Sequence, residues 1–401
     1  MKSIVATLTC LLLLMRSVHA LPHKGNGKGG HFGSGNHPGD SHKGGHPSKR
    51  DYATVSNVTI FTPDSDFTLP GVYYARSLEL ADGTVLATWE NYSPEPPLVS
   101  FPIFKSTDGG ATWTHISNVT DQVNSWGLRY QPFLYLLEEQ VGEYAPGTIL
   151  LAGNSIPTDL NYTKIDVYAS KDNGYTWEFV SNVASGGRAV PDNGLTPIWE
   201  PFIITYNGEI VLYYSDQGDS AHGQILVHKT STDLLSWSSS VVDAEYYDYY
   251  ARPGMTTVAK LPNGKYIMTY EYGGAPGYSS YTFAVYYHIA DDPRQFNSSA
   301  SVPLVATNGD KPSSSPYVIW TEHGGENGTI VVNSQSHSGI YINKALGDPD
   351  SWEYVDLDAP RAYTRDLNVI GGDKLVVLGA GAGSSVLNHV TYYTYWLKDL
   401  F

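Results

Sequence analysis

The sequence STDGGATW occupies Ser106–Trp113, and SKDNGYTW occupies Ser170–Trp177. Both follow the pattern Ser-x-Asp-x-Gly-x-Thr-Trp, and STDLLSW at Ser231–Trp237 is a degenerate third copy. This pattern is typical of a tight turn, because an Asp side chain bonds nearby backbone N–H groups and Gly accepts a positive φ. We therefore interpret the motif as a structural turn that repeats with the fold, and we expect Asp108 and Asp172 to lie away from the catalytic site.

The motif ends a longer repeat of about sixty residues. The aromatic residues that close successive repeats are Trp113, Trp177, Trp237, Phe296 and Trp352. Each repeat begins with two strands joined by a short turn containing Gly or Asn, as in YYARSLELADGTVLATWEN from Tyr73. No helical periodicity interrupts this pattern. The sequence therefore predicts an all-β fold, a six-bladed β-propeller with four antiparallel strands in each blade.

The two ends of the chain are predicted to meet in one blade. After Ala380 the last repeat has room for one more good strand, HVTYYTYWL. The segment SNVTIFTP at Ser56–Pro63 can supply the missing outer strand. We expect this N-terminal strand to close the last blade, because closure removes exposed sheet edges.

The first fifty residues predict an extracellular protein. Residues 1–20 contain Lys2, an apolar run too short to cross a membrane, and small residues at Val18 and Ala20, as in a signal peptide. Residues 21–50 are rich in Gly, His, Lys and Ser and end in a dibasic pair, so we expect a disordered pro-segment or linker before a catalytic domain at 51–401. Six Asn-x-Ser/Thr sequons are expected to carry glycans: Asn57, Asn91, Asn118, Asn161, Asn297 and Asn327.

Composition excludes several classes of function. The net charge of −16 argues against binding to nucleic acid, which requires a basic surface. Cys10 is the only cysteine and lies in the predicted signal peptide, so a mature protein would have no disulfide. No phosphate-binding loop, zinc-ligand spacing or Ser-His-Asp pattern is evident. We expect a monomer that needs no cofactor or metal and does not act on a membrane.

The topology also predicts where the functional site lies. In each blade the start of the innermost strand and the end of the second strand share one face, so polar and aromatic residues at these positions line one funnel. Aromatic rings there are expected to stack on sugars, and Glu90, Gln131 and Asp216 to bind sugar hydroxyls. The predicted substrate-binding residues are Tyr74, Arg76, Trp89, Glu90, Trp126, Arg129, Tyr130, Gln131, Asn154, Trp199, Asp216, Arg252, Tyr270, Gln335 and Arg365.

Two glutamates in this funnel are the candidate catalytic residues. Glu200 in PIWEPF and Glu271 in MTYEYGG come from adjacent repeats and the same face. Cleavage of a glycoside with retention needs two such carboxyl groups, a nucleophile and an acid/base. We assign Glu200 as the nucleophile and Glu271 as the acid/base, and the sequence leaves the reverse assignment open.

Several longer strings resemble a known enzyme family. WGLRYQPF, GLTPIWEPF and RPGMTTVAKLPNGKYIMTYEYGG are similar to the family 93 glycoside hydrolases of fungi, and the repeated turns resemble the Asp-boxes of sialidase-like propellers. The resemblance extends over 51–401. It implies a secreted, retaining exo-α-1,5-L-arabinanase that releases arabinobiose from linear arabinan, with Glu200 and Glu271 as its catalytic pair.

Two other functions remain open at this point. A sialidase would clamp the substrate carboxylate with three arginines, for which Arg76, Arg252 and Arg365 are candidates. A carbohydrate-binding propeller without activity would repeat one site in every blade. The funnel residues instead differ from repeat to repeat, which favours a single asymmetric site.

Overall fold

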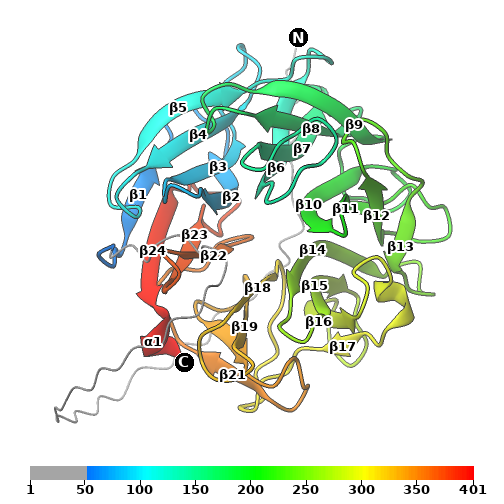
Figure 1. Ribbon diagram of the computed structural model, residues 1–401. Helices are drawn as coiled ribbons and strands as arrows, with labels where there is room; N and C mark the ends of the chain where they lie inside the picture. The colour runs from blue at the N-terminus through cyan, green and yellow to red at the C-terminus, as the bar shows by residue number, and fades with distance from the viewer. Residues whose placement is uncertain (1–51) are drawn as a thin grey trace.

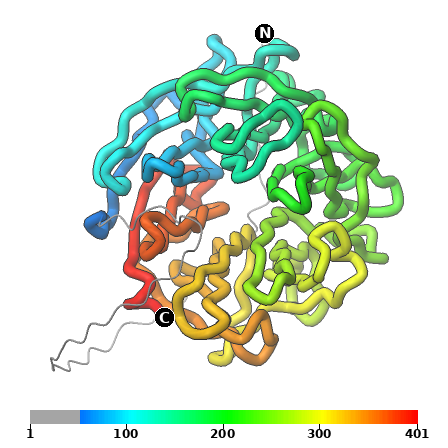
Figure 2. The backbone as a smooth tube through the Cα atoms, viewed as in Figure 1, coloured from blue at the N-terminus to red at the C-terminus, as the bar shows by residue number. Residues whose placement is uncertain are grey.

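Six sheets stand around a central axis in the computed structural model, which describes residues 52–401 (Figure 1). Each sheet has four antiparallel strands, and we number the sheets as blades I–VI in chain order. The predicted signal peptide and the 21–50 segment lie outside the described residues. Figure 2 follows the chain around the ring, in which consecutive blades occupy consecutive positions. The predicted six-bladed propeller is thereby confirmed.

The innermost strand of each blade comes first in the chain, and the strands then run outward. Blade I contains β2 (Val72–Glu79), β3 (Val85–Asn91), β4 (Phe101–Ser106) and β5 (Thr114–Val119). Blade II contains β6 (Gly127–Leu136), β7 (Ile149–Ile156), β8 (Thr163–Ser170) and β9 (Glu178–Gly186). Blade III contains β10 (Ile198–Tyr206), β11 (Glu209–Asp216), β12 (Ile225–Ser231) and β13 (Val241–Ala244).

The second half of the chain repeats this order. Blade IV contains β14 (Arg252–Lys260), β15 (Tyr266–Gly273), β16 (Phe283–Ala290) and β17 (Val302–Pro303), with the 3-10 helix η1 (Phe296–Ser298) before β17. Blade V contains β18 (Tyr317–Thr321), β19 (Thr329–Asn333), β20 (Ile340–Asn343) and β21 (Trp352–Val355). Blade VI contains β22 (Asp366–Ile370), β23 (Lys374–Gly379) and β24 (Val390–Trp396), followed by the short helix α1 (Leu397–Leu400).

The fourth strand of blade VI is the N-terminal strand β1 (Val58–Phe61), as the sequence predicts. It pairs antiparallel with β24, with Val58 opposite Tyr392 and Thr59 opposite Thr391. Ile60 packs into the buried cluster between blades VI and I. Hydrogen bonds and burial thus join the two ends of the described chain, and β1 covers the edge of β24 that would otherwise be open.

The repeated Ser-x-Asp-x-Gly-x-Thr-Trp motif joins the third and fourth strands of its blade. In the first copy, Oδ1 of Asp108 accepts hydrogen bonds from the Thr112 N–H at 2.9 Å and the Ser106 hydroxyl at 2.8 Å. The indole N–H of Trp113 donates to the Gly110 carbonyl at 2.9 Å. The second copy, around Asp172, has the same bonds. These aspartates satisfy their own turns, so the motif is structural.

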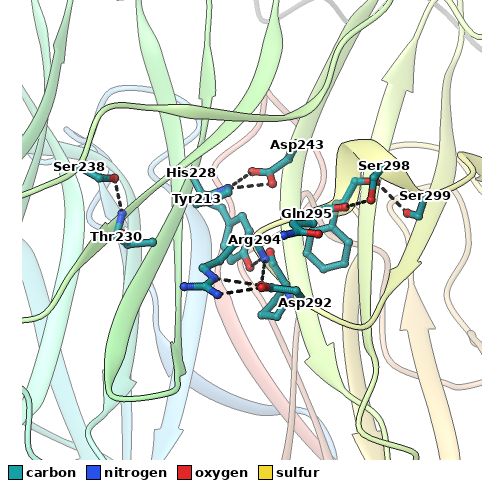
Figure 3. Close-up of polar contacts among 12 residues, drawn as sticks. Tyr213, His228, Thr230, Ser238, Asp243, Asp292, Arg294, Gln295, Ser298 and Ser299 are labelled. Carbon is teal, nitrogen blue, oxygen red and sulfur yellow. Dashed lines mark hydrogen bonds and ion pairs between the residues drawn. The ribbon is translucent and has the colours of Figure 1, made fainter.

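Apolar side chains fill the spaces between blades. Phe133 of β6 and Phe202 of β10, for example, meet near the axis with ring centroids 4.4 Å apart. Farther out in blade III, Nδ1 of His228 lies 2.9 Å and 3.0 Å from the two carboxylate oxygens of Asp243 (Figure 3). Both side chains are almost completely buried.

Among residues 52–401, no helix is long and apolar enough to cross a membrane.

Candidate active site

A left-handed residue recurs at the start of the innermost strand of every blade. In blades I–IV it coincides with a shift of register between the first two strands, that is, with a β-bulge. Such a φ is costly for a residue other than glycine, and functional sites are where this cost is usually found. The six residues and their φ angles are Tyr74 (53°), Gln131 (60°), Glu200 (63°), Met255 (60°), Ser315 (52°) and Thr364 (54°).

Among these residues, the backbone amides in blades II to V each bond to a side chain of the preceding blade. The N–H of Gln131 donates to Oε1 of Glu90 at 2.9 Å, and the N–H of Glu200 donates to Oε1 of Gln131 at 2.9 Å. The Met255 N–H donates to Oε2 of Glu200 at 2.7 Å. The N–H of Ser315 donates in the same way to a carboxylate of blade IV. The bulge amides therefore hold a row of polar side chains around one end of the axis.

Glu200 and Glu271 both lie close to Gly254. A Cβ atom added to Gly254 would be 3.5 Å from Oε2 of Glu200 and 3.6 Å from Cγ of Glu271. Gly254 is directly opposite Glu271 in the β14–β15 register. Glycine at this position leaves space between two carboxyl groups that come from adjacent blades.

Glu200 is a buried carboxylate surrounded by donors. Its Oε2 accepts the Ser215 hydroxyl at 2.7 Å as well as the Met255 amide. Burial raises the pKa of Glu200, while these two hydrogen bonds and the positive charges of Arg252 and Arg76 act in the opposite direction. Burial is the largest of these effects, so the pKa of Glu200 lies above its ordinary value, and the two donors and two guanidinium groups limit that rise.

Glu271 is the carboxyl group that is more easily kept protonated. Burial, followed by the negative charge of Glu200, raises its pKa to about 7. Its Oε2 accepts hydrogen bonds from the Ser315 N–H at 2.8 Å and the Ser314 hydroxyl at 3.2 Å. Both donors bind the same oxygen, and with a pKa of about 7 a substantial fraction of Glu271 is protonated near neutral pH.

Arg252 stands beside this pair and organises the loops around it. Its guanidinium donates to Oδ1 of Asn193 at 2.7 Å, to Oε1 of Gln217 at 3.0 Å and to Oε1 of Gln224 at 2.9 Å. The Trp199 indole N–H also donates to Oε1 of Gln217 at 2.9 Å. Arg252 therefore supplies positive charge to the site while its hydrogen bonds go to neutral amides.

Arg76, Tyr74 and Glu90 extend the site into blade I. The Arg76 guanidinium lies 4.1 Å from the Tyr74 ring centroid and donates to the Thr364 carbonyl at 2.9 Å. Glu90 accepts the Tyr92 hydroxyl at 2.8 Å, and burial raises its pKa to about 7. A third carboxyl group therefore lies close to the candidate catalytic pair.

Aromatic rings form a wall around blades VI, I, II and III. Tyr130 lies next to Trp199, with centroids 6.4 Å apart, and next to Tyr92 at 6.0 Å. The row continues through Tyr73, which is 5.4 Å from Tyr363. Tyr130 and Trp199 are among the predicted substrate-binding residues, whereas Tyr92, Tyr73 and Tyr363 are not. Tyr92 lies two residues after Glu90, directly after β3, and this spacing could have predicted that the two side chains share one face.

Four of the predicted substrate-binding residues are buried and bonded or packed within the protein. Trp89 is 0% exposed and packs between the rings of Phe61 and Phe104, and Tyr270 is also 0% exposed and bonds to the Tyr246 hydroxyl. Successive strand residues point to opposite sides, so Trp89 and Tyr270 face away from the side that Glu90 and Glu271 occupy. Asn154 and Arg365 are buried as well, and their side chains donate to backbone carbonyls. Asn154 donates to the Ile198 carbonyl, and Arg365 donates to the carbonyls of His337 and Gly339.

The remaining predicted residues lie farther out. Asp216 is half-buried and accepts the Gly218 N–H at 2.6 Å, as in a turn. Gln335 is half-buried, and its N–H donates to the Ser314 carbonyl at 2.9 Å. Arg129 forms an ion pair with Glu95 at 2.8 Å. Trp126 stacks on Tyr162 with centroids 5.8 Å apart.

The structure also locates the other candidate sites. Five of the six sequon asparagines are exposed, whereas Asn91 is half-buried at the end of β3 with its amide oxygen covered. Within 52–401, no group of three or more His, Cys, Asp or Glu residues is arranged to hold a metal ion. The hollow at the far end of the axis is lined by inner-strand residues such as Phe133, Phe202 and Tyr317, without a carboxylate.

Solved structures with the same fold were found. The α-L-arabinofuranosidase of Fusarium graminearum, described as GH93 and solved with arabinobiose, is 53% identical over 86% of this chain and 99% of its own, with a TM-score of 0.84. The α-L-arabinanase of Penicillium chrysogenum, also with arabinobiose, is 49% identical over 87% of this chain and 100% of its own, with a TM-score of 0.84.

A more distant structure shares only the fold. The NanB sialidase of Streptococcus pneumoniae is 11% identical over 86% of this chain and 71% of its own, with a TM-score of 0.56. No protein-family model and no curated protein matches the chain. Identities of 49–53% over almost the whole length of two enzymes nevertheless decide its membership. The chain belongs to glycoside hydrolase family 93.

Proposed function

We propose that this protein is a retaining exo-α-L-arabinanase, which cleaves linear α-1,5-arabinan from its non-reducing end and releases arabinobiose. The observation that carries the proposal is that Glu200 and Glu271, from adjacent blades, both lie close to Gly254 and have different electrostatic surroundings. Two family relatives bind arabinobiose in their solved structures. A buried pair of carboxyl groups is the machinery that glycoside cleavage needs.

The mechanism follows from the two environments. Glu200, whose carboxylate accepts two hydrogen bonds and lies near two guanidinium groups, attacks the anomeric carbon in its ionised form. Glu271, with its pKa of about 7, donates its proton to the departing glycosidic oxygen. The glycosyl–enzyme ester forms as the C–O bond breaks. Glu271 then removes a proton from water, which displaces Glu200 and releases arabinobiose with the original anomeric configuration.

The sugar units beyond the scissile bond require a neutral, hydrogen-bonding funnel. The aromatic wall that includes Tyr130 and Trp199 offers ring faces to sugar C–H groups. Glu90 and Gln131, held in the same row, are suited to bind sugar hydroxyls. Such groups reject ligands that leave them without a partner.

The proposal includes secretion. The apolar run of residues 1–20 and the five exposed sequons support action outside the cell, where plant cell-wall arabinan would be the substrate. Cleavage after the predicted signal peptide and release of sugar by a glycan-removing amidase can be read by mass spectrometry of the secreted protein. An unprocessed, unglycosylated protein retained in cells would contradict this part.

The alternative of a sialidase has little structural support. Arg365 is 1% exposed and donates to the carbonyls of His337 and Gly339, so it cannot join Arg76 and Arg252 in a clamp. The test is incubation of the purified protein with linear arabinan and with sialyllactose, followed by chromatography. We expect arabinobiose as the first product, and proton NMR should show the retained anomer. Release of sialic acid, or of the inverted anomer, would overturn the proposal.

A further inference from the structure

Three exposed tyrosines lie next to the candidate active site. Tyr247 is 104% exposed, Tyr250 68% and Tyr281 47%. They come from two loops, residues 245–251 between β13 and β14 and residues 274–282 between β15 and β16. We name these three side chains the tyrosine rim. A cluster of exposed aromatic rings forgoes the free energy of burial, and such clusters usually mark a binding surface.

The 245–251 loop is held in place even though two of its rings are exposed. The ring of Tyr246 stacks on Tyr272 with centroids 3.7 Å apart and an interplanar angle of 16°. The Asn193 side chain donates to the Tyr249 carbonyl at 3.3 Å. Because the loop is anchored from both sides, binding orders only the exposed side chains and costs less conformational entropy than ordering a mobile loop would.

The rim is connected directly to the strand that carries Glu271. The Tyr281 hydroxyl donates to the Tyr250 carbonyl at 2.9 Å, which ties the two loops together. The same hydroxyl lies 2.9 Å from the Cβ position of Gly273. Gly273 follows Glu271 by two residues on β15, and residues at this spacing face the same side of a strand. The rim therefore begins on the Glu271 side of the catalytic pair.

The position beside Glu271 identifies what part of a substrate would reach the rim. A general acid must contact the oxygen of the group that leaves, so the leaving part of the substrate lies on its side of the site. We propose that the tyrosine rim binds the arabinosyl units of the departing chain, downstream of the scissile bond. This inference rests on the proposed arabinan-cleaving function.

The charges around the rim favour a neutral glycan. Glu245 and Asp248 are exposed on the same loop, and the whole chain carries a net charge of −16. An anionic polysaccharide would be repelled by these carboxylates. Linear arabinan has no charge, and its furanose rings present C–H groups that can pack against aromatic faces.

The test compares a short and a long substrate. Cleavage of arabinotriose leaves one departing unit, whereas cleavage of arabinohexaose leaves a chain that can reach the rim. In the Tyr247→Ala/Tyr250→Ala variant we expect the ratio of kcat/KM for hexaose to kcat/KM for triose to fall about ten-fold relative to wild type, because two stacking faces are lost. The Tyr247→Phe/Tyr250→Phe variant keeps both rings and should keep the wild-type ratio.

A matched control comes from the structural turn around Asp172. Tyr175 is 49% exposed and lies in that turn, between the third and fourth strands of blade II, so Tyr175→Ala should leave the ratio unchanged. If wild type cleaves both oligosaccharides and the double alanine variant keeps the wild-type ratio, the rim inference is overturned alone. If wild type cleaves neither, the proposed function fails and the rim inference fails with it.

Discussion

The backbone N–H of Met255 in blade IV donates to Oε2 of Glu200 in blade III at 2.7 Å. Met255 reaches this position because its φ is 60°, at the β-bulge that opens β14. A backbone donor has no rotamer freedom, so the packing of two blades orients the carboxylate. The Ser215 hydroxyl binds the same oxygen at 2.7 Å. Glu200 is therefore held through one oxygen.

The first prediction concerns that hydroxyl. Ser215→Ala removes a hydrogen bond that favours the ionised form, so the pKa of Glu200 should rise. Because the nucleophile must be ionised, the acidic limb of kcat/KM should move to higher pH, with about a ten-fold loss of activity below that limb. A pH–rate profile measures the shift. Movement of the alkaline limb alone would indicate that Glu200 is the acid/base instead.

The second prediction concerns the matching serine on the other carboxyl group. Activity should fall as pH rises through about 7, because Glu271 must be protonated to act as the acid. Ser314→Ala removes a donor to the ionised form, which raises the pKa of Glu271 and moves the alkaline limb to higher pH. The two serine variants thus move different limbs. An alkaline limb unaffected by Ser314→Ala would contradict the assignment of Glu271.

The third prediction separates the two catalytic roles. With nitrophenyl arabinobioside, whose leaving group needs no proton, Glu271→Ala should still form the glycosyl–enzyme, and azide should speed its release as the glycosyl azide. On arabinan the same variant should be slower by about 10²–10⁴-fold. Glu200→Gln should be inactive on both substrates with or without azide. Azide rescue of a Glu200 variant with retained configuration would reverse the roles.

The fourth prediction concerns stability. The pKa of Glu271 is about 7 in the folded protein and ordinarily 4.5, so the folded state binds this proton more tightly than the unfolded chain. The stability that the protonated group confers is present below pH 4.5 and is lost as the pH rises through about 7. Glu271→Gln removes this loss and should raise the free energy of unfolding at pH 8 by about 2–3 kcal/mol.

The comparison of pH values is the control for that measurement. At pH 4 the gain from Glu271→Gln should be small, because the wild-type group is already protonated. The exposed Glu353 provides a matched variant, Glu353→Gln, which should change little at either pH. Denaturant unfolding at pH 4 and pH 8 gives the change in the free energy of unfolding, relative to wild type, for each of the two variants. An equal gain at pH 4 and pH 8 would show that the effect is not due to ionisation.

The fifth prediction concerns the repeated turn. Asp108→Ala leaves the Thr112 N–H and hydroxyl without their acceptor, so the free energy of unfolding should fall by about 1 kcal/mol. The turn lies at the outer edge of blade I, so kcat and KM should be unchanged below the melting transition. Thermal unfolding measures the loss of stability, and kinetics on arabinan measure kcat and KM. A loss of kcat in the folded variant would return Asp108 to the list of catalytic candidates.

The sequence was sufficient for the architecture. Turn chemistry and strand periodicity are local properties, so the motifs at Ser106–Trp113 and Ser170–Trp177 predicted the blades, and the unpaired segment at Ser56–Pro63 predicted ring closure. Blade topology also brought Glu200 and Glu271 to one end of the axis. These predictions succeeded because each needed only the order of the strands.

The details of the site were decided by tertiary structure. Trp89 and Tyr270 were expected in the funnel, but each lies in the core, because the direction of a strand residue depends on register. The donors from Met255, Ser314 and Ser315 arise from left-handed residues whose φ angles no sequence motif announces. The packing of six blades around one axis imposes those conformations, and contacts between strands far apart in the chain compensate for the strain. That is why the sequence identified the carboxylates, while only the folded ring determined which groups hold them.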